Sequence, residues 1–153
     1  MSEYRSFIVP YDFSAHARAA LFTATDLARH LGADLHLVHV IQPPAFAYMG
    51  GEGAAALPPS IDMPEVFERT RRSLRDVASG VENPPGKVEA HVLEGSGIAD
   101  MIIGAAEEHD ADLIVMGTHG RTGLAHVFLG SVAERTLRRA PCPVLTVQAP
   151  DES

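Results

Sequence analysis

Three glycines and a serine mark the connection that follows the apolar run at residues 113–116. From Gly117 to Ser131 this connection has the spacing G-x2-G-x9-G-S. Gly130 precedes a helical pattern, and the free amides and dipole at the start of a helix attract phosphate. The residues therefore fit a phosphate-binding loop, but an ordinary long connection between a strand and a helix fits them equally well.

Individual residues of this loop have expected roles in such a site. Gly117 leaves the strand end open to a ligand, and Gly120 allows a positive φ in a tight turn. Ser131 adds a hydroxyl group, and Arg121 adds a positive charge. Because the loop contains no lysine, it is not a Walker A sequence.

A second candidate, Asp12, lies in residues 9–14 (VPYDFS), at the end of the first apolar run. Its carboxylate would accept a hydrogen bond from a ribose hydroxyl, or lie near a phosphate-bound cation such as Mg2+. Taken alone, an aspartate in this position is more often a turn residue or a helix cap. We expect no catalytic residue and no metal site formed by protein ligands alone.

Other patterns are weaker. Residues 95–97 (GSG) resemble a dinucleotide-binding turn, but Asp100 occupies the third glycine position. His36 and His39 look like a metal-binding pair, yet on a strand they point to opposite faces. The eight histidines show no other ligand spacing, so we expect no structural zinc. Cys142 is the only cysteine, which excludes an intrachain disulfide and fits a cytoplasmic setting.

The elements that must position these residues alternate along the chain. Apolar runs predict strands at residues 7–11, 35–41, 87–93, 113–116 and 143–148. Helical spacing predicts helices over residues 14–31, 64–79 and 98–106, and from residue 130 onward. This alternation implies an α/β fold with a mostly parallel, doubly wound sheet, which binds ligands at the carboxyl ends of its strands. The proline-rich residues 42–64 form a long loop, expected to be a lid or a mobile segment.

Composition limits the function classes. One domain over residues 1–148 with a loose tail at 149–153 fits the length, and 46% hydrophobic residues predict a packed core. The net charge of −8 argues against nucleic-acid or anionic-membrane binding. The arginines near residues 69–75 alternate with acidic residues, which indicates a solvated helix face. No apolar stretch is long enough to span a membrane, and no signal peptide is evident, so we expect a cytoplasmic protein.

Residues 112–120 (DLIVMGTHG), continuing through Gly130 and Ser131 to residues 143–147 (PVLTV), resemble the universal stress protein family. Residues 9–14 fit the same family, so the resemblance covers essentially the whole chain. The spacing G-x2-G-x9-G-(S/T) is typical of its ATP-binding branch. The resemblance implies a Rossmann-like five-stranded sheet in the order 3-2-1-4-5 with four helices. It also implies a homodimer formed through strand 143–147.

The family resemblance implies which residues hold the nucleotide. The nucleoside would be lined by Pro10, Tyr11, Asp12 and Val40. The sugar and phosphates would be lined by Met116, Gly117, His119, Gly120, Gly130, Ser131 and Val132. We therefore expect an ATP-binding stress-response regulator with little turnover, in which Mg2+ accompanies ATP. The alternatives are a slow ATPase or autophosphorylating enzyme, and a nucleotide-free dimeric interaction module.

Overall fold

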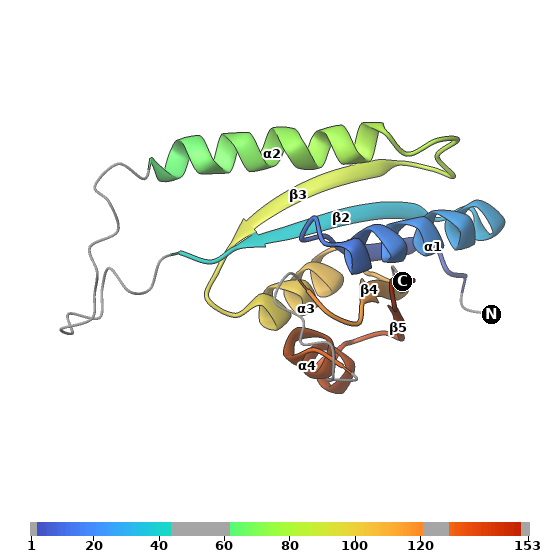
Figure 1. Cartoon of the computed structure of the whole chain (residues 1–153). Coiled ribbons are helices and arrows are strands. Elements are labelled where there is room, and N and C mark those ends of the chain that lie inside the picture. Colours follow the sequence, from blue (N-terminus) through green and yellow to red (C-terminus); the bar gives the residue numbers. More distant parts are fainter. Residues whose placement is uncertain (1–2, 44–61, 121–128, 151–153) are drawn as a thin grey trace.

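A single parallel sheet of five strands organises the chain. The computed structural model describes residues 3–43, 62–120 and 129–150. These residues form, in chain order, β1 (Ser6–Pro10), α1 (Ala15–Leu31), β2 (Asp34–Ile41), α2 (Met63–Ser79), β3 (Val88–Glu94), α3 (Ile98–Glu108), β4 (Leu113–Gly117), α4 (Ser131–Arg139) and β5 (Val144–Val147). The strand order is β3-β2-β1-β4-β5, which confirms the predicted α/β topology (Figure 1).

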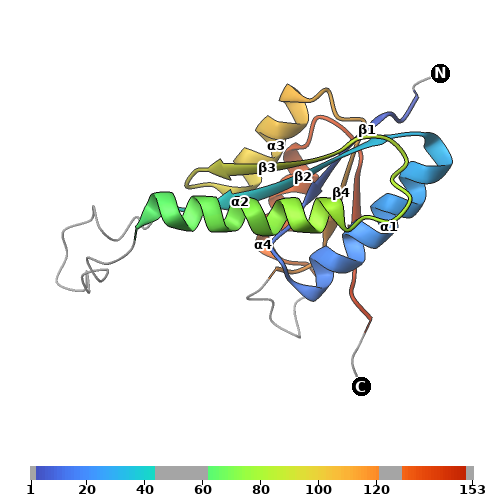
Figure 2. The same cartoon turned by 90° about the horizontal axis from the view of Figure 1, so that it is seen from above.

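Alternate residues of each strand face opposite layers of helices. In β1, Phe7 and Val9 point into the apolar cluster shared with α1 and α2. Ile8 points into a second cluster shared with α3 and α4. Figure 2 shows α1 and α2 lying together along one side of the sheet. Because both faces are covered, β1 and β4 are buried and apolar at their central residues, as parallel strands usually are.

Small side chains bring α1 close to the sheet. Its buried face is built largely from alanines, namely Ala17, Ala20, Ala24 and Ala28. The helix begins where the Ser14 side chain accepts a hydrogen bond from the Ala17 amide at 3.1 Å. It ends at Gly32, whose φ of 69° is a left-handed conformation that glycine adopts without strain. The predicted limits of this helix are confirmed.

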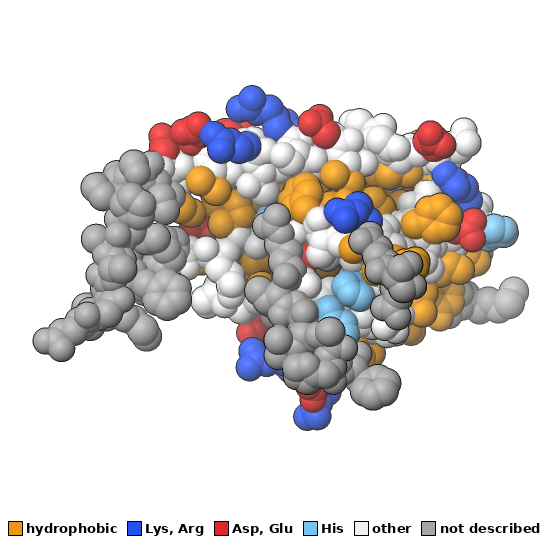
Figure 3. All heavy atoms as spheres, viewed as in Figure 1, with side chains coloured by type: hydrophobic (Ala, Val, Ile, Leu, Met, Phe, Trp, Pro, Cys, Tyr) orange, Lys and Arg blue, Asp and Glu red, His pale blue; other side chains and the backbone are white. Residues whose placement is uncertain are grey.

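The outer surface of α2 is charged, and two of its arginines form ion pairs with glutamates of the same helix. The helix begins one residue earlier than predicted, at Met63, because the Asp62 side chain caps it by accepting from the Glu65 amide. Arg69 pairs with Glu65 at 2.9 Å. Figure 3 shows acidic and basic side chains interleaved along this ridge, with apolar side chains between α2 and α1. The arginines therefore lie on a solvated face, as the sequence indicates.

The first residue of the predicted tail contacts α1. Ala149 donates its amide to Nδ1 of His16 at 2.9 Å.

Within residues 3–43, 62–120 and 129–150, no helix has the length and apolar character needed to cross a membrane.

Candidate functional site

The sheet reverses its winding direction between β1 and β4, and the candidate residues follow the carboxyl ends of these two neighbours. Asp12 follows β1, and Gly120 follows β4. A Cβ atom on Gly120 would lie 2.7 Å from Oδ2 of Asp12. The structure thus brings Asp12 and the glycine-spaced loop into direct contact.

Asp12 has a structural task in addition to any ligand contact. Its Oδ1 accepts a hydrogen bond from the Ser14 amide at 3.0 Å, which closes the turn leading into α1. The turn-residue alternative is therefore correct for this oxygen. The second oxygen, Oδ2, faces Gly120. The turn therefore holds the carboxylate in a fixed orientation toward the glycine-spaced loop.

The structure shows packing reasons for two of the glycines that were not inferred from the sequence. A Cβ on Gly117 would lie 2.7 Å from Cβ of His16 and 2.9 Å from its backbone carbonyl carbon. Packing against α1 is thus a second reason for a glycine at this position, besides the ligand approach expected from the sequence. Gly120 does not have the expected positive φ, since Gly32 alone among the described glycines does. Its lack of a side chain instead makes room for Asp12.

Gly130 fixes the start of α4 beside the same loop. Its amide donates to the Thr118 carbonyl at 2.8 Å. A Cβ at Gly130 would lie 3.1 Å from that carbonyl oxygen. As the N-cap of α4, Gly130 offers no side chain to the first amides of the helix. The amides of Ser131 and Val132 are thus at a helix start, where an anion is favoured.

Three of the residues predicted to line the nucleotide pack into the core on the α3 and α4 side of the sheet. Met116 of β4 is buried in this apolar cluster, and Val40 of β2 and Val132 of α4 are partly buried against it. Val40 and Val132 are therefore the members of this set that keep apolar surface outside the core.

Pro10 and Tyr11 contribute differently from one another. Pro10 is half-buried at the end of β1. The ring of Tyr11 turns into the opposite apolar cluster and packs edge-on against Phe13. Burial raises the pKa of the Tyr11 hydroxyl, so it stays protonated at neutral pH. Only the backbone of Tyr11 is therefore suited to contact a ligand in the crevice.

His119 of the loop lies beside His16 of α1, and only His119 was predicted from the sequence to line the site. Nδ1 of His119 lies 3.0 Å from the Thr118 hydroxyl. His16, in the first turn of α1, has its ring centre 5.3 Å from that of His119. His16 comes two residues after the N-cap Ser14, so the sequence could have placed it at the same edge of the sheet as Asp12. Arg121 lies outside the described residues, as do residues 44–61 of the long loop.

A separate group of histidines was missed altogether. His36 of β2, His91 of β3 and His109 after α3 have ring nitrogens within 4.8 Å of one another. Their separations along the chain match no familiar ligand motif. His36 and His39 point to opposite faces of the strand, as expected from the sequence, since His39 contacts the Tyr11 carbonyl and His36 contacts His91.

Cys142 does not add a nucleophile. It lines a shallow hollow of about 280 Å³ with Tyr4 and Asp112, among others. Burial raises the pKa of the Cys142 thiol, and the charge of Asp112 raises it further. The thiol therefore stays protonated at neutral pH, and a protonated thiol is a poor nucleophile.

Comparison with known proteins identifies the family. Residues 3–148 match the model of the universal stress protein family. The chain belongs to this family. Universal stress protein MJ0531 of Methanocaldococcus jannaschii is 35% identical over 147 residues, which are 96% of this chain and 84% of that protein.

Solved structures resemble this universal stress protein over almost its full length. The structure of protein MJ0577 is 26% identical, with a TM-score of 0.80, and the match covers 99% of this chain and 100% of that one. The universal stress protein from Archaeoglobus fulgidus in complex with dAMP is 25% identical, with a TM-score of 0.65. That match covers 95% of this chain and 99% of that one.

The packing of Gly117 gives a first prediction. Gly117→Ala should lower the free energy of unfolding by about 1–3 kcal/mol, because the new methyl group must displace the backbone at His16. Gly104→Ala is the matched control, since a Cβ at Gly104, inside α3, meets nothing within 4 Å. It should raise the free energy of unfolding by roughly 0.5–1 kcal/mol. Urea denaturation measures both, and equal effects would contradict the packing argument.

Proposed function

We propose that this universal stress protein binds ATP in the crevice between Asp12 and the glycine-spaced loop, and acts as a nucleotide-dependent regulator in the cytoplasm. The observation that carries the proposal is the direct approach of Gly120 to Asp12, next to a helix start whose cap residue has no side chain. Adenine nucleotide binding by the Archaeoglobus relative in complex with dAMP supports it.

The residues fit the parts of the nucleotide in order. Val40 and Val132, which are only partly buried, would contact the base, with Met116 buried behind them. Oδ2 of Asp12 is available to a ribose hydroxyl. The first amides of α4 and the Ser131 hydroxyl suit the phosphates, with Mg2+ arriving on the nucleotide. His119 and Gly120 belong to the loop after β4 and would lie between the ribose and the phosphates.

The site supports binding better than rapid catalysis. Phosphoryl transfer requires a base that positions the nucleophile and cations that neutralise the phosphates. Asp12 already accepts a hydrogen bond from Ser14, and Nδ1 of His119 lies within hydrogen-bond distance of Thr118. These contacts engage both side chains within the fold itself, whereas a catalytic base must face the attacking nucleophile. We therefore propose weak hydrolysis at most, with a slow ATPase or autophosphorylating enzyme as the alternative.

We also propose a homodimer through the strand at residues 143–147. β5 is an outer strand of the sheet, and the side chain of Leu145 is exposed there. An apolar outer strand favours pairing with a second strand. A nucleotide-free dimeric interaction module would share this surface, so the binding experiments separate the two functions.

Nucleotide affinity tests the assignment of the phosphates to α4. Gly130→Val should weaken ATP binding by about thirtyfold or more, equivalent to ~2 kcal/mol, because charge-assisted amide bonds are lost. Gly97→Ala is the control, since Gly97 also begins a helix without a side-chain cap. Its Cβ would meet only the side chain of Asp100. Isothermal titration calorimetry on variants shown to be folded by circular dichroism measures both.

The two glycine variants also give a clear contrary result. If Gly97→Ala abolishes ATP binding while Gly130→Val binds normally, the phosphates lie at α3 and the site is misassigned. If the wild-type protein binds no adenine nucleotide, the interaction-module alternative holds.

Turnover separates a binding protein from an enzyme. We expect steady-state ATP hydrolysis far below the ~1–100 s⁻¹ typical of kinases, because Asp12, the carboxylate at the site, is held in the turn into α1 by the Ser14 amide. A coupled phosphate-release assay with Mg2+ measures the rate. Turnover within the kinase range would overturn the regulator in favour of an enzyme.

The dimer prediction uses two exposed leucines. Leu145→Lys places a charge in the proposed strand pairing and should shift the protein to monomers. Leu31→Lys, at the end of α1, changes an exposed apolar residue outside that surface and should leave the dimer intact. Analytical ultracentrifugation at micromolar concentration distinguishes the species. A monomeric wild-type protein would exclude the proposed interface.

A further inference from the structure

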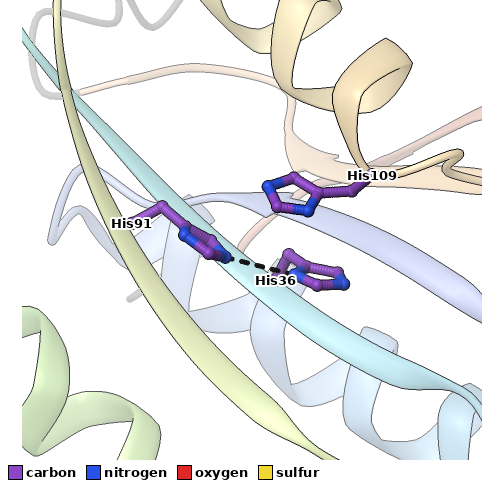
Figure 4. Close-up of side chains that lie close together, drawn as sticks. All are labelled: His36, His91 and His109. Atoms are coloured by element: carbon purple, nitrogen blue, oxygen red, sulfur yellow. Dashed lines mark hydrogen bonds between the residues drawn. The ribbon is translucent and has the colours of Figure 1, made fainter.

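Three histidines from three different elements meet on the α3 side of the sheet. Figure 4 shows His36 on β2, His91 on β3 and His109 at the end of α3, with their rings gathered together. The ring centres of His36 and His91 lie 4.4 Å and 4.6 Å from that of His109. α3 ends at the amino edge of the sheet, where the Ser6 hydroxyl donates to the His109 carbonyl. The group is therefore remote from the nucleotide crevice at the carboxyl edge.

A carboxylate completes the set of potential ligands. Oε2 of Glu89 lies 3.1 Å from Nδ1 of His36 and 3.7 Å from Nε2 of His91. These two ring nitrogens are themselves 3.1 Å apart. Ligand atoms about 2.1 Å from a tetrahedral zinc ion lie about 3.4 Å from one another. The three atoms thus already form a triangle of the size that one face of a zinc tetrahedron requires.

We propose that His36, His91 and His109, together with Glu89, form a binding site for a divalent transition-metal ion, and that zinc is the ion it suits best. Imidazole nitrogens suit zinc, copper, iron and nickel, and a tetrahedral set with one carboxylate favours zinc. The site replaces the expectation, based on linear spacing, that the histidines bind no zinc.

The sheet preorganises three of the four ligands. His36 and Glu89 are directly paired across β2 and β3. His91 is two residues beyond Glu89 on the same strand, so both side chains point to the same face. The C-cap position of His109 brings the fourth ligand over this face from α3. A metal ion would therefore fasten the end of α3 to the outer half of the sheet.

The electrostatic environment favours a cation over protonated rings. Burial lowers the pKa of His36 and of His91, and the neighbouring His109 lowers both further. Neutral imidazoles keep the lone pairs that a metal needs. The carboxylates of Glu89 and Asp34 act on His36, and those of Glu89 and Glu108 act on His91. One divalent ion would interact favourably with all of these groups at once.

The competing interpretation is a hydrogen-bonded polar cluster without an ion. In that case the contacts of His36 with His91 and Glu89 stabilise the strand pair directly. The two interpretations differ in zinc stoichiometry, in the spectrum of a substituted metal and in the response of stability to zinc.

The experiment uses the full, untagged chain, freed of metal by a chelator and of nucleotide, because ATP phosphates also bind zinc. Titration with Zn2+ against a chromophoric chelator should show one tight site per chain. His91→Gln should weaken zinc binding by at least tenfold and abolish the zinc-induced rise in melting temperature. His30→Gln changes an exposed histidine of α1 and should leave both unchanged.

Cobalt gives a measurement that requires no variant. Co2+ bound at this site should show the intense visible bands of tetrahedral coordination, and Zn2+ should displace it at one equivalent. The weak bands of octahedral cobalt, or the absence of stoichiometric zinc, would overturn the proposal. Zinc binding that requires ATP would assign the ion to the phosphates and would overturn the proposal. Loss of zinc binding in His16→Gln, with binding retained in His91→Gln, would move the site to the His16 and His119 pair and would also overturn the proposal.

Discussion

The loop after β4 runs so close to α1 and to the turn after β1 that neither Gly117 nor Gly120 has space for a Cβ atom. This close approach depends on the alanine face of α1, which lets the helix lie low over the sheet. It also depends on the Asp12 turn, which keeps the carboxylate beneath the loop. The proposed site is therefore formed mainly by the close approach of two backbone segments, the loop after β4 and the turn after β1.

The two edges of the sheet carry different kinds of polar chemistry. At the carboxyl edge, the backbone amides of a helix start lie near one carboxylate, and such a site is suited to reversible binding of a large anion. Toward the amino edge, neutral rings and a carboxylate converge on a point, which is suited to a small cation. Between them, the middle strand β1 is buried and apolar from Phe7 to Val9. The two proposed sites are thus separated by the core itself.

The sequence predicted the elements well because apolar runs and capping residues act locally. The helix predicted over residues 14–31 agrees with α1, which lies between the Ser14 cap and Gly32. The strand order followed from family resemblance and is confirmed, whereas the packing of Gly117 and Gly120 against residues far away in the chain was not predicted. The histidine group was not predictable from spacing, because it requires the register of β2 on β3 and the end point of α3. His36 opposite Glu89 is visible only once that register is known.

Helix α4 and β4 link the proposed nucleotide site to the proposed dimer edge. The Thr118 amide donates to the Val147 carbonyl at 2.9 Å, so the loop and the outer strand are directly joined. The second route runs through α4, whose start is the proposed phosphate site and which is separated from β5 by residues 140–143 alone. A nucleotide bound at Thr118 and the start of α4 would therefore also bias the conformation of β5. By thermodynamic linkage, dimer formation must then raise nucleotide affinity by the same factor as the nucleotide strengthens the dimer. In such a regulator the signal is carried by coupling between two binding equilibria, and no catalytic group is needed.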